Sequence, residues 1–198
     1  MKGGIGLFWN SDVEVTVKNH SNAHIDATVR WKGSDSPLWR FTGFYGEPRA
    51  ESRSQSWDFL RTLYGIQHGG WLCMGDFNET MYASEHFSAH PRSESQMLAF
   101  REVVDFCSFQ DLGWRGLPFT WDNKQQGDAN VKARLDRALA NPSFLSLFEF
   151  SSVKHISSTV SDHCYVLTEM RKSPVSSWPR SQRSFRYENV WQTHEDYD

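Results

Sequence analysis

Apolar and polar positions alternate in short runs through the first quarter of the chain. Val13, Val15 and Val17 are separated by polar residues, and two more runs rich in β-branched and aromatic residues follow at 23–33 and 38–46. The run GGIGLFW before them is also apolar and is interrupted by glycine. Period-two alternation bounded by Asn, Ser and Gly is typical of half-buried strands. We therefore predict that the chain opens with an antiparallel meander.

A helical period replaces this alternation at two places. In residues 51–67 the apolar side chains recur every three or four positions, and the helix is expected to end before the glycines at 69–70. Residues 94–108 have a similar apolar stripe. Ser93 followed three positions later by Gln96 has the spacing of a capping box, which predicts the start of this second helix.

A third, short helix is predicted to start at Asn141, with Asn as the N-cap and Pro142 in the first helical position. A short apolar strand is predicted at 71–75, and further strands are predicted around 119–123 and 133–141. Strands that come first and then alternate with helices point to an α+β fold or a layered α/β sandwich.

Polar side chains stand at the ends of three apolar runs. Asp76 and Asn78 follow the run WLCMG, Asp136 lies in RLDRAL, and Asp162 and His163 directly precede CYVLTEM. Strand-end loops are where functional residues are commonly held by a rigid scaffold. Taken singly, each motif also has a plain structural reading, as a turn, as a helix face with a surface ion pair, or as a loop or cap. Their joint occurrence beside apolar runs favours a functional site.

The direction of these side chains follows from the alternation along a strand. Asp76 and Asn78 are two positions apart, so on an extended chain both point to one face. Asp162 and His163 are adjacent, so they point to opposite sides and can serve different partners.

Composition and charge narrow the class of protein. With 198 residues, of which 38% are hydrophobic and 15% aromatic, the chain is long enough for one domain with a sizeable core and is not a disordered sequence. With a net charge of −3, the chain lacks the overall positive charge that is typical of proteins that bind nucleic acid regardless of sequence. Any contact with nucleic acid therefore has to come from a local group of basic residues.

The cysteines and the lengths of the apolar runs indicate in which cellular compartment the protein is expected. Cys73, Cys107 and Cys164 are odd in number, widely spaced and set among apolar residues, which predicts buried free thiols rather than disulfides or a zinc site. No apolar run reaches the length of about 18 residues that a membrane span needs. No secretory signal is recognisable, so we expect an intracellular protein, in the nucleus or the cytoplasm.

The motifs GDFNE, RLDRAL and SDH, in this order, with TGFYG upstream and FTW between them, resemble the endonuclease/exonuclease/phosphatase superfamily. Within it, the chain is most similar to the endonuclease-like domain of plant non-LTR (LINE-type) retrotransposon proteins, on the runs GGIGLFW, WRFTGFYGEP, WLCMGDFNE, RGLPFTWDN, RLDRALANP and FRYENVW. This resemblance implies a four-layer α/β/β/α sandwich and cleavage of phosphodiester or phosphomonoester bonds in DNA with Mg²⁺ or Mn²⁺.

The resemblance also implies roles for individual residues. His163 would contact the scissile phosphate or act as acid or base, and Asp136 would orient it. Asp76 would position or deprotonate the attacking water. Asn78 would donate to a phosphate oxygen, and Tyr45 would contact the phosphate or the leaving group.

Further roles concern the metal and the nucleic-acid strand. Asp162 would help to hold the metal ion, since hard oxygen ligands suit Mg²⁺. Thr120, Trp121 and Arg134 would contact the bound strand. Phe119 and Trp121 could equally well be core residues.

The beginning of the chain departs from the family pattern. Family members place two strands before the GGxGLFW region, the first with a site asparagine and the second with a metal-binding glutamate. Met1 stands two residues before that region, and neither Glu14 nor Glu79 takes the place of the glutamate. We therefore expect an N-terminally truncated domain that lacks its first two strands, binds its metal weakly and can self-associate through a free sheet edge.

The amino-acid composition changes near the end of the chain. Residues 1–170 are expected to form the truncated domain, and 171–198 to form a basic linker rich in Ser and Pro followed by an aromatic tail.

Three functions remain open at this point. The first is a metal-dependent, retroelement-derived DNA endonuclease of low or no activity. The second is a catalytically dead remnant that binds nucleic acid or a protein, supported by the basic positions Lys132, Arg134 and Arg137 and those in 171–186. The third is a small-molecule phosphatase of the same superfamily. The motifs shared with the retrotransposon proteins argue against it, but substrate choice depends on loops that the motifs do not cover.

Overall fold

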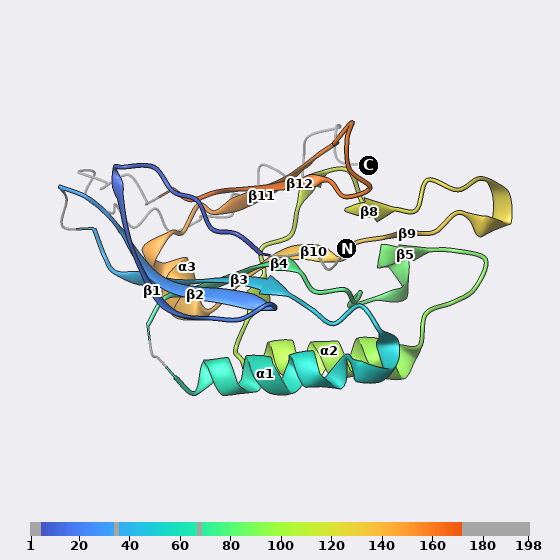
Figure 1. Ribbon diagram of the computed structural model, residues 1–198, viewed down its shortest axis with the longest axis horizontal. Helices are drawn as coiled ribbons and strands as arrows, with labels where there is room; N and C mark the ends of the chain where they lie inside the picture. The colour runs from blue at the N-terminus through green and yellow to red at the C-terminus, as the bar shows by residue number, and fades with distance from the viewer. Residues whose placement is uncertain (1–4, 34–35, 67–68, 172–198) are drawn as a thin grey trace, which may run out of the picture.

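A computed structural model describes residues 5–33, 36–66 and 69–171 of the chain. Its centre is a six-stranded mixed sheet in the order β1-β2-β3-β4-β10-β6 (Figure 1). The strands are β1 (Val13–His20), β2 (His24–Trp31), β3 (Trp39–Tyr45), β4 (Trp71–Asp76), β10 (Asp136–Ala140) and β6 (Gln110–Asp111).

Two smaller sheets accompany the large one. The first contains β12 (Tyr165–Glu169), β11 (Ser152–Ile156) and β7 (Arg115–Gly116), and the second contains β5 (His86–Phe87), β9 (Lys132–Ala133) and β8 (Trp121–Asp122). The helices are α1 (Ser54–Tyr64), α2 (Glu94–Phe106) and α3 (Pro142–Leu147), with 3₁₀ turns η1 (Ala50–Ser52), η2 (Ala83–Glu85) and η3 (Gly127–Ala129).

The predicted meander is confirmed, because β1, β2 and β3 pair antiparallel in chain order. The described part of the GGIGLFW run, residues 5–9, forms no strand. α1 then crosses the sheet, so β4 returns parallel to β3.

The helices α2 and α3 both start where the sequence signals place them, with Ser93 and Asn141 as N-caps, but only one of the two predicted caps forms its side-chain hydrogen bond. Asn141 caps α3 as predicted, since its Oδ1 accepts the backbone N–H of Phe144 at 2.9 Å. The capping box predicted at Ser93 is wrong, because the Ser93 hydroxyl bonds to the Ser95 hydroxyl at 2.8 Å and caps no backbone N–H.

β4 is buried on both faces, which explains its unbroken apolar sequence. Trp71 and Cys73 pack with the helices in one core cluster, whereas Leu72 and Met74 belong to a second cluster on the opposite face. The hydrophobic effect therefore fixes β4 at the centre of the domain and fixes which side chains point to which face.

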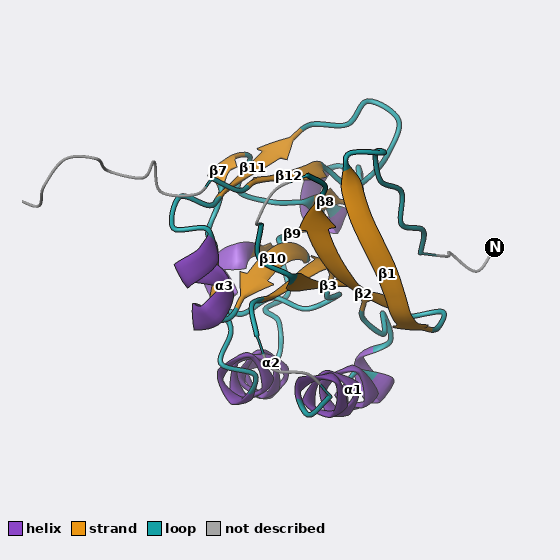
Figure 2. Cartoon of the chain, turned by 90° about the vertical axis from the view of Figure 1, so that its left-hand side faces the viewer, coloured by secondary structure: helices purple, strands orange, loops and turns teal. Residues whose placement is uncertain are grey.

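The layers are arranged in the order helices, large sheet and small sheet. Figure 2 shows α1 and α2 below the large sheet and β7, β11 and β12 above it. Tyr165 and Leu167 on the outer face of β12 are 59% and 46% exposed, and none of the described helices forms a fourth layer over them. The fold is thus a mixed α/β arrangement of several sheets, and the four-layer sandwich is confirmed only in part.

Other expectations concern the chain ends. The loss of two initial strands stays a prediction, and the tail that we expected at 171–198 lies, from residue 172 on, outside the described residues. Within the described ranges, every helix is too short or too polar to cross a bilayer.

The aromatic core between α1, α2 and the sheet gives a first prediction. Phe100 is fully buried, stacks on Trp57 with ring centroids 4.6 Å apart and lies 5.4 Å from the Phe77 ring. Phe100→Ala should lower the free energy of unfolding in urea by about 3–5 kcal/mol, because it leaves a cavity that the surrounding rings cannot fill. Leu98→Ala, at an exposed position of the same helix, should cost less than about 0.5 kcal/mol. Equal losses would show that this cluster is not the packed core.

Candidate active site

Three strand ends meet at one edge of the large sheet. Asp76 is the last residue of β4 and pairs in register with Tyr45, the last residue of β3, and with Asp136, the first residue of β10. Gly75 permits this approach, because a Cβ there would lie 2.0 Å from the carbonyl oxygen of Phe44. Residues predicted from three distant motifs therefore lie side by side.

Asp136 holds His163 beside this edge. The Nδ1 atom of His163 lies 2.9 Å from Oδ2 of Asp136, and His163 makes an isolated β-bridge with Trp121. The bond to Asp136 raises the pKa of His163, and the charges of Asp76 and Asp162 act in the same direction. The imidazole is therefore held in one orientation, with Nε2 as its remaining nitrogen.

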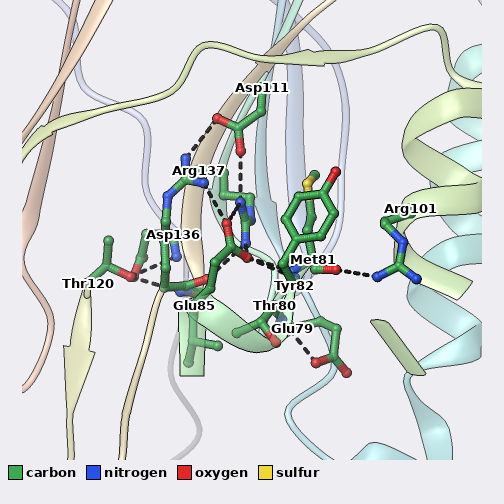
Figure 3. A network of polar contacts seen from close by, with 12 residues as sticks. Glu79, Thr80, Met81, Tyr82, Glu85, Arg101, Asp111, Thr120, Asp136 and Arg137 are labelled. Atoms are coloured by element: carbon green, nitrogen blue, oxygen red, sulfur yellow. Dashed lines mark hydrogen bonds and ion pairs between the residues drawn. The ribbon is translucent and has the colours of Figure 1, made fainter. Parts of the chain in front are cut away.

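Thr120 fixes the chain at the start of β10. Its hydroxyl oxygen accepts the backbone N–H groups of Leu135 and Asp136, each at 2.9 Å, and the residue is fully buried (Figure 3). The buried hydroxyl already serves the backbone, so the contact between Thr120 and a nucleic-acid strand stays a prediction, although Thr120 lines a cavity beside His163.

Asp76 and Asn78 form a turn rather than a continued strand. Asn78 has φ of 55°, a left-handed conformation that Asn tolerates better than most residues. Its backbone N–H donates to Oδ1 of Asp76 at 2.8 Å, and its side-chain amide donates to Oδ2 of Asp76 at 3.0 Å and to the carbonyl of Gly46 at 2.9 Å. The prediction that both side chains share a strand face is wrong, and the turn brings them together instead.

Asp76 has the most perturbed carboxyl group of the site. Burial, followed by repulsion from Asp136, raises its pKa to about 6, although the hydrogen bonds from Asn78 oppose the change. A carboxyl group with this pKa changes its protonation state close to neutral pH, as general bases do.

A buried ion-pair network lies behind Asp136 on β10. Arg134 and Arg137 pair with both Glu85 and Asp111, and both arginines are at most 2% exposed. Figure 3 shows Arg137 between the two carboxylates. Two of the basic positions assigned to nucleic-acid binding, Arg134 and Arg137, are therefore already paired with buried carboxylates, and the role of Arg134 as a substrate contact stays a prediction that its burial disfavours. The helix-face reading of RLDRAL is also wrong, because Asp136 and Arg137 lie on a strand.

A cavity of about 310 Å³ opens beside His163. It is lined by apolar side chains that include Phe119 and Trp121, and by the charged side chains of Lys124, Lys132 and Asp162. The indole Nε1 of Trp121 donates to Oδ2 of Asp162 at 2.9 Å. Asp162 and His163 therefore serve different partners, as the alternation predicts.

Magnesium, which the resemblance implies, is not matched by a ligand cluster. Protein Mg²⁺ sites use one or two carboxylates with several waters in octahedral geometry. In the part of the chain that the structure describes, no three His, Cys, Asp or Glu side chains are grouped closely enough to hold a metal ion. A magnesium site within the described residues would therefore use fewer than three protein ligands, and each chemical role proposed for this chain is assigned to its own side chains.

Sequence reasoning missed the residues that support the site. Glu85 and Asp111 neutralise the two buried arginines, and Glu79 pairs with Arg53 and Arg92. No spacing rule links partners that are 13 to 52 positions apart. The one available signal was a glutamate directly after GDFN.

The comparisons with known proteins agree with this architecture. The sequence profile of the Endonuclease/Exonuclease/phosphatase family matches residues 1–163. The endonuclease domain of TRAS1, a telomere-specific non-LTR retrotransposon, matches with a TM-score of 0.58 and 16% identity over 82% of this chain and 71% of that domain. The 3′ phosphatase NExo from Neisseria, bound to a product DNA hairpin, matches with a TM-score of 0.55 and 18% identity over 81% of this chain and 70% of that one. Both likenesses show the fold alone. No curated protein matches the chain.

The raised pKa of Asp76 predicts a pH-dependent cost in stability. The folded chain holds more protons than the unfolded chain between the ordinary pKa of 3.8 and the folded value of about 6, so the free energy of unfolding falls as pH rises through this window. Asp76→Asn should remove this fall and gain on the order of 2 kcal/mol relative to wild type between pH 4 and pH 7. Urea unfolding of both proteins across this range measures the difference, and parallel stability curves would contradict the assignment.

Proposed function

Because the chain belongs to the endonuclease/exonuclease/phosphatase family, we propose that its site hydrolyses phosphodiester bonds in DNA. The observation that carries this proposal is the convergence of Asp76, Asp136 and His163 at one sheet edge. These side chains supply a group that can activate water and a cation that can bind a phosphate.

His163 and Asp136 would act on the phosphate side. The bond from Nδ1 to Asp136 favours the protonated imidazole, whose Nε2–H can donate to a non-bridging oxygen or to the leaving oxygen. Tyr45, which is 40% exposed on the neighbouring strand, presents a hydroxyl at the same edge.

Asp76 would act on the water side. Above a pH of about 6 it is a carboxylate that can orient or deprotonate the attacking water. Asn78 uses both amide hydrogens on Asp76 and Gly46. We therefore assign Asn78 to orienting Asp76, in place of the phosphate contact that the resemblance implies.

We further propose that the domain derives from a non-LTR retroelement and that its turnover is slow. The motif series supports the lineage. A divalent cation would find the exposed carboxylate of Asp162 beside the cavity, with one of its oxygens already bonded to Trp121. One such ligand supports only weak binding, so the rate should rise with Mg²⁺ or Mn²⁺ without saturating at low concentration.

A plasmid-nicking assay tests the activity. Purified protein should convert supercoiled DNA slowly to the nicked form in Mg²⁺, and His163→Ala should lower the rate by about 100-fold or more. His90→Ala, at an exposed histidine in a loop, should leave the rate unchanged. Nicking that persists in His163→Ala would refute the assignment.

DNA binding without cleavage is a second candidate function. Lys124 and Lys132 line the cavity beside His163, next to the Trp121 ring on which a base can stack. Wild-type protein that binds DNA but never nicks it, over a range of Mg²⁺ and Mn²⁺ concentrations, would favour this candidate over hydrolysis.

The lysines at the cavity predict the effect of charge removal on binding. Lys124→Gln should weaken DNA binding about 3- to 10-fold and reduce the slope of log K against log salt by about 1, because one phosphate contact is lost. Lys154→Gln, at an exposed position on β11, is the matched control. Fluorescence anisotropy with a labelled oligonucleotide over a salt series measures both values. Equal losses for the two variants would place the DNA elsewhere.

A further inference from the structure

Glu79 is a fully buried carboxylate with two arginine partners. Its Oε1 accepts from Nε of Arg92 at 2.6 Å and from the backbone N–H of Thr80 at 2.9 Å, and its Oε2 accepts from Nη1 of Arg53. Figure 3 shows Glu79 and Thr80 in the segment that runs toward Glu85. Glu79 and Arg53 are buried and the Arg92 side chain is 18% exposed, so one negative and two positive charges are held largely out of solvent in a constrained geometry.

Arg53 connects Glu79 to the segment that follows β3. Its Nη2 donates to the carbonyl of Pro48 at 2.8 Å, and its Nε donates to the carbonyl of Glu47 at 3.2 Å. These carbonyls lie two and three residues beyond Tyr45. One end of the cluster therefore fixes the chain directly after the site residue of β3.

Arg92 connects Glu79 to the turn that follows β4. Its Nη2 donates to the carbonyl of Asn78 at 2.8 Å. This bond holds the left-handed residue whose amide groups orient Asp76. Arg92 therefore constrains the turn that orients Asp76, the residue proposed to activate the attacking water.

The two segments are pressed together between these ends. The N–H of Gly46 donates to the carbonyl of Asp76 at 2.7 Å, and a Cβ at Gly46 would lie 2.3 Å from the carbonyl oxygen of Phe77. So close an approach leaves the turn few alternative positions as long as both arginines hold it.

We propose that Glu79 is a positioning residue for the active site, which it serves by holding Asn78 against Asp76 through Arg92 and the end of β3 through Arg53. A role in stability alone does not explain why both arginines extend past Glu79 to the carbonyls that flank the site. Buried ion pairs are also poor stabilisers compared with apolar packing of similar volume. The catalytic part of this inference rests on the proposed hydrolase function, whereas the effect on Asp76 does not.

The test is Glu79→Gln, which keeps the side-chain volume but places an amide N–H₂ against a guanidinium. Nicking should show kcat lowered by about 10- to 100-fold with KM changed less than about 3-fold, because orientation is lost and binding is kept. The pKa of Asp76, followed by ¹³C NMR of its carboxyl carbon, should rise by about 0.5 or more, because the Asn78 hydrogen bonds that favour the carboxylate weaken.

The matched control is Asp26→Asn. Asp26 is another buried carboxylate, paired with Arg40 and Thr42 on the helix-facing side of the sheet. It should lose stability as Glu79→Gln does but keep the wild-type kcat and the wild-type pKa of Asp76. Equal kcat and Asp76 titration in Glu79→Gln and Asp26→Asn would overturn the proposal.

Two further results keep the inference separate from the proposed function and from misfolding. If wild-type protein does not nick DNA, the hydrolase proposal fails and the titration of Asp76 alone decides the role of Glu79. If Glu79→Gln does not fold, Arg92→Gln removes only the arm that ends on Asn78 and should give the same rise in the pKa of Asp76. An unchanged pKa in that variant would refute the positioning role.

Discussion

The burial of β4 on both faces is the constraint on which the rest of this structure depends. An apolar strand between two core clusters has to lie at the centre of the sheet, with β3 parallel on one side and β10 antiparallel on the other. Its last residue, Asp76, then stands directly opposite Asp136 at the boundary of the core. Burial there, together with repulsion from Asp136, raises the pKa of Asp76 to about 6 and so gives the site a group that titrates near neutral pH.

Apolar packing places the strands, but charge and hydrogen bonding place the loops. The segment between β4 and α2 contains little regular structure, yet it carries Asn78, Glu79 and Glu85, each with several partners. Glu85 ties this segment to β10 through Arg137 and to its own backbone through the N–H of Met81. Buried carboxylates therefore fix the position of this loop, whereas apolar side-chain packing fixes the positions of α1 and α2.

The sequence predicted the elements that rest on local periodicity. β4, α1 and α2 follow from apolar spacing, and α3 follows from the pair Asn141 and Pro142. Such signals lie within one element, so no tertiary knowledge is needed to interpret them. The grouping of Asp76, Asp136 and His163 followed from a family resemblance, since nothing local to the three motifs shows that they meet.

Sequence reasoning failed where a residue's environment is supplied by distant segments. Arg134 looked like a surface cation, but Glu85 and Asp111 enclose it. Thr120 looked like a substrate contact, but its hydroxyl accepts the backbone N–H of Asp136 at the start of β10. Asn78 looked like a strand residue because turn chemistry and alternation compete after a glycine, and the bond from Arg92 to its carbonyl supports the turn.

The pairing of one carboxylate, that of Glu79, with two arginines has an evolutionary consequence. Loss of the carboxylate alone leaves two neighbouring guanidinium groups, one buried and one partly buried, without their shared partner, and loss of one arginine alone leaves a carbonyl near the site without its donor. Each single change is unfavourable, whereas a joint replacement by apolar side chains of similar volume is tolerable. Positions 53, 79 and 92 should therefore covary among related sequences, and a lineage that changes one of the three residues should exchange all three as a set.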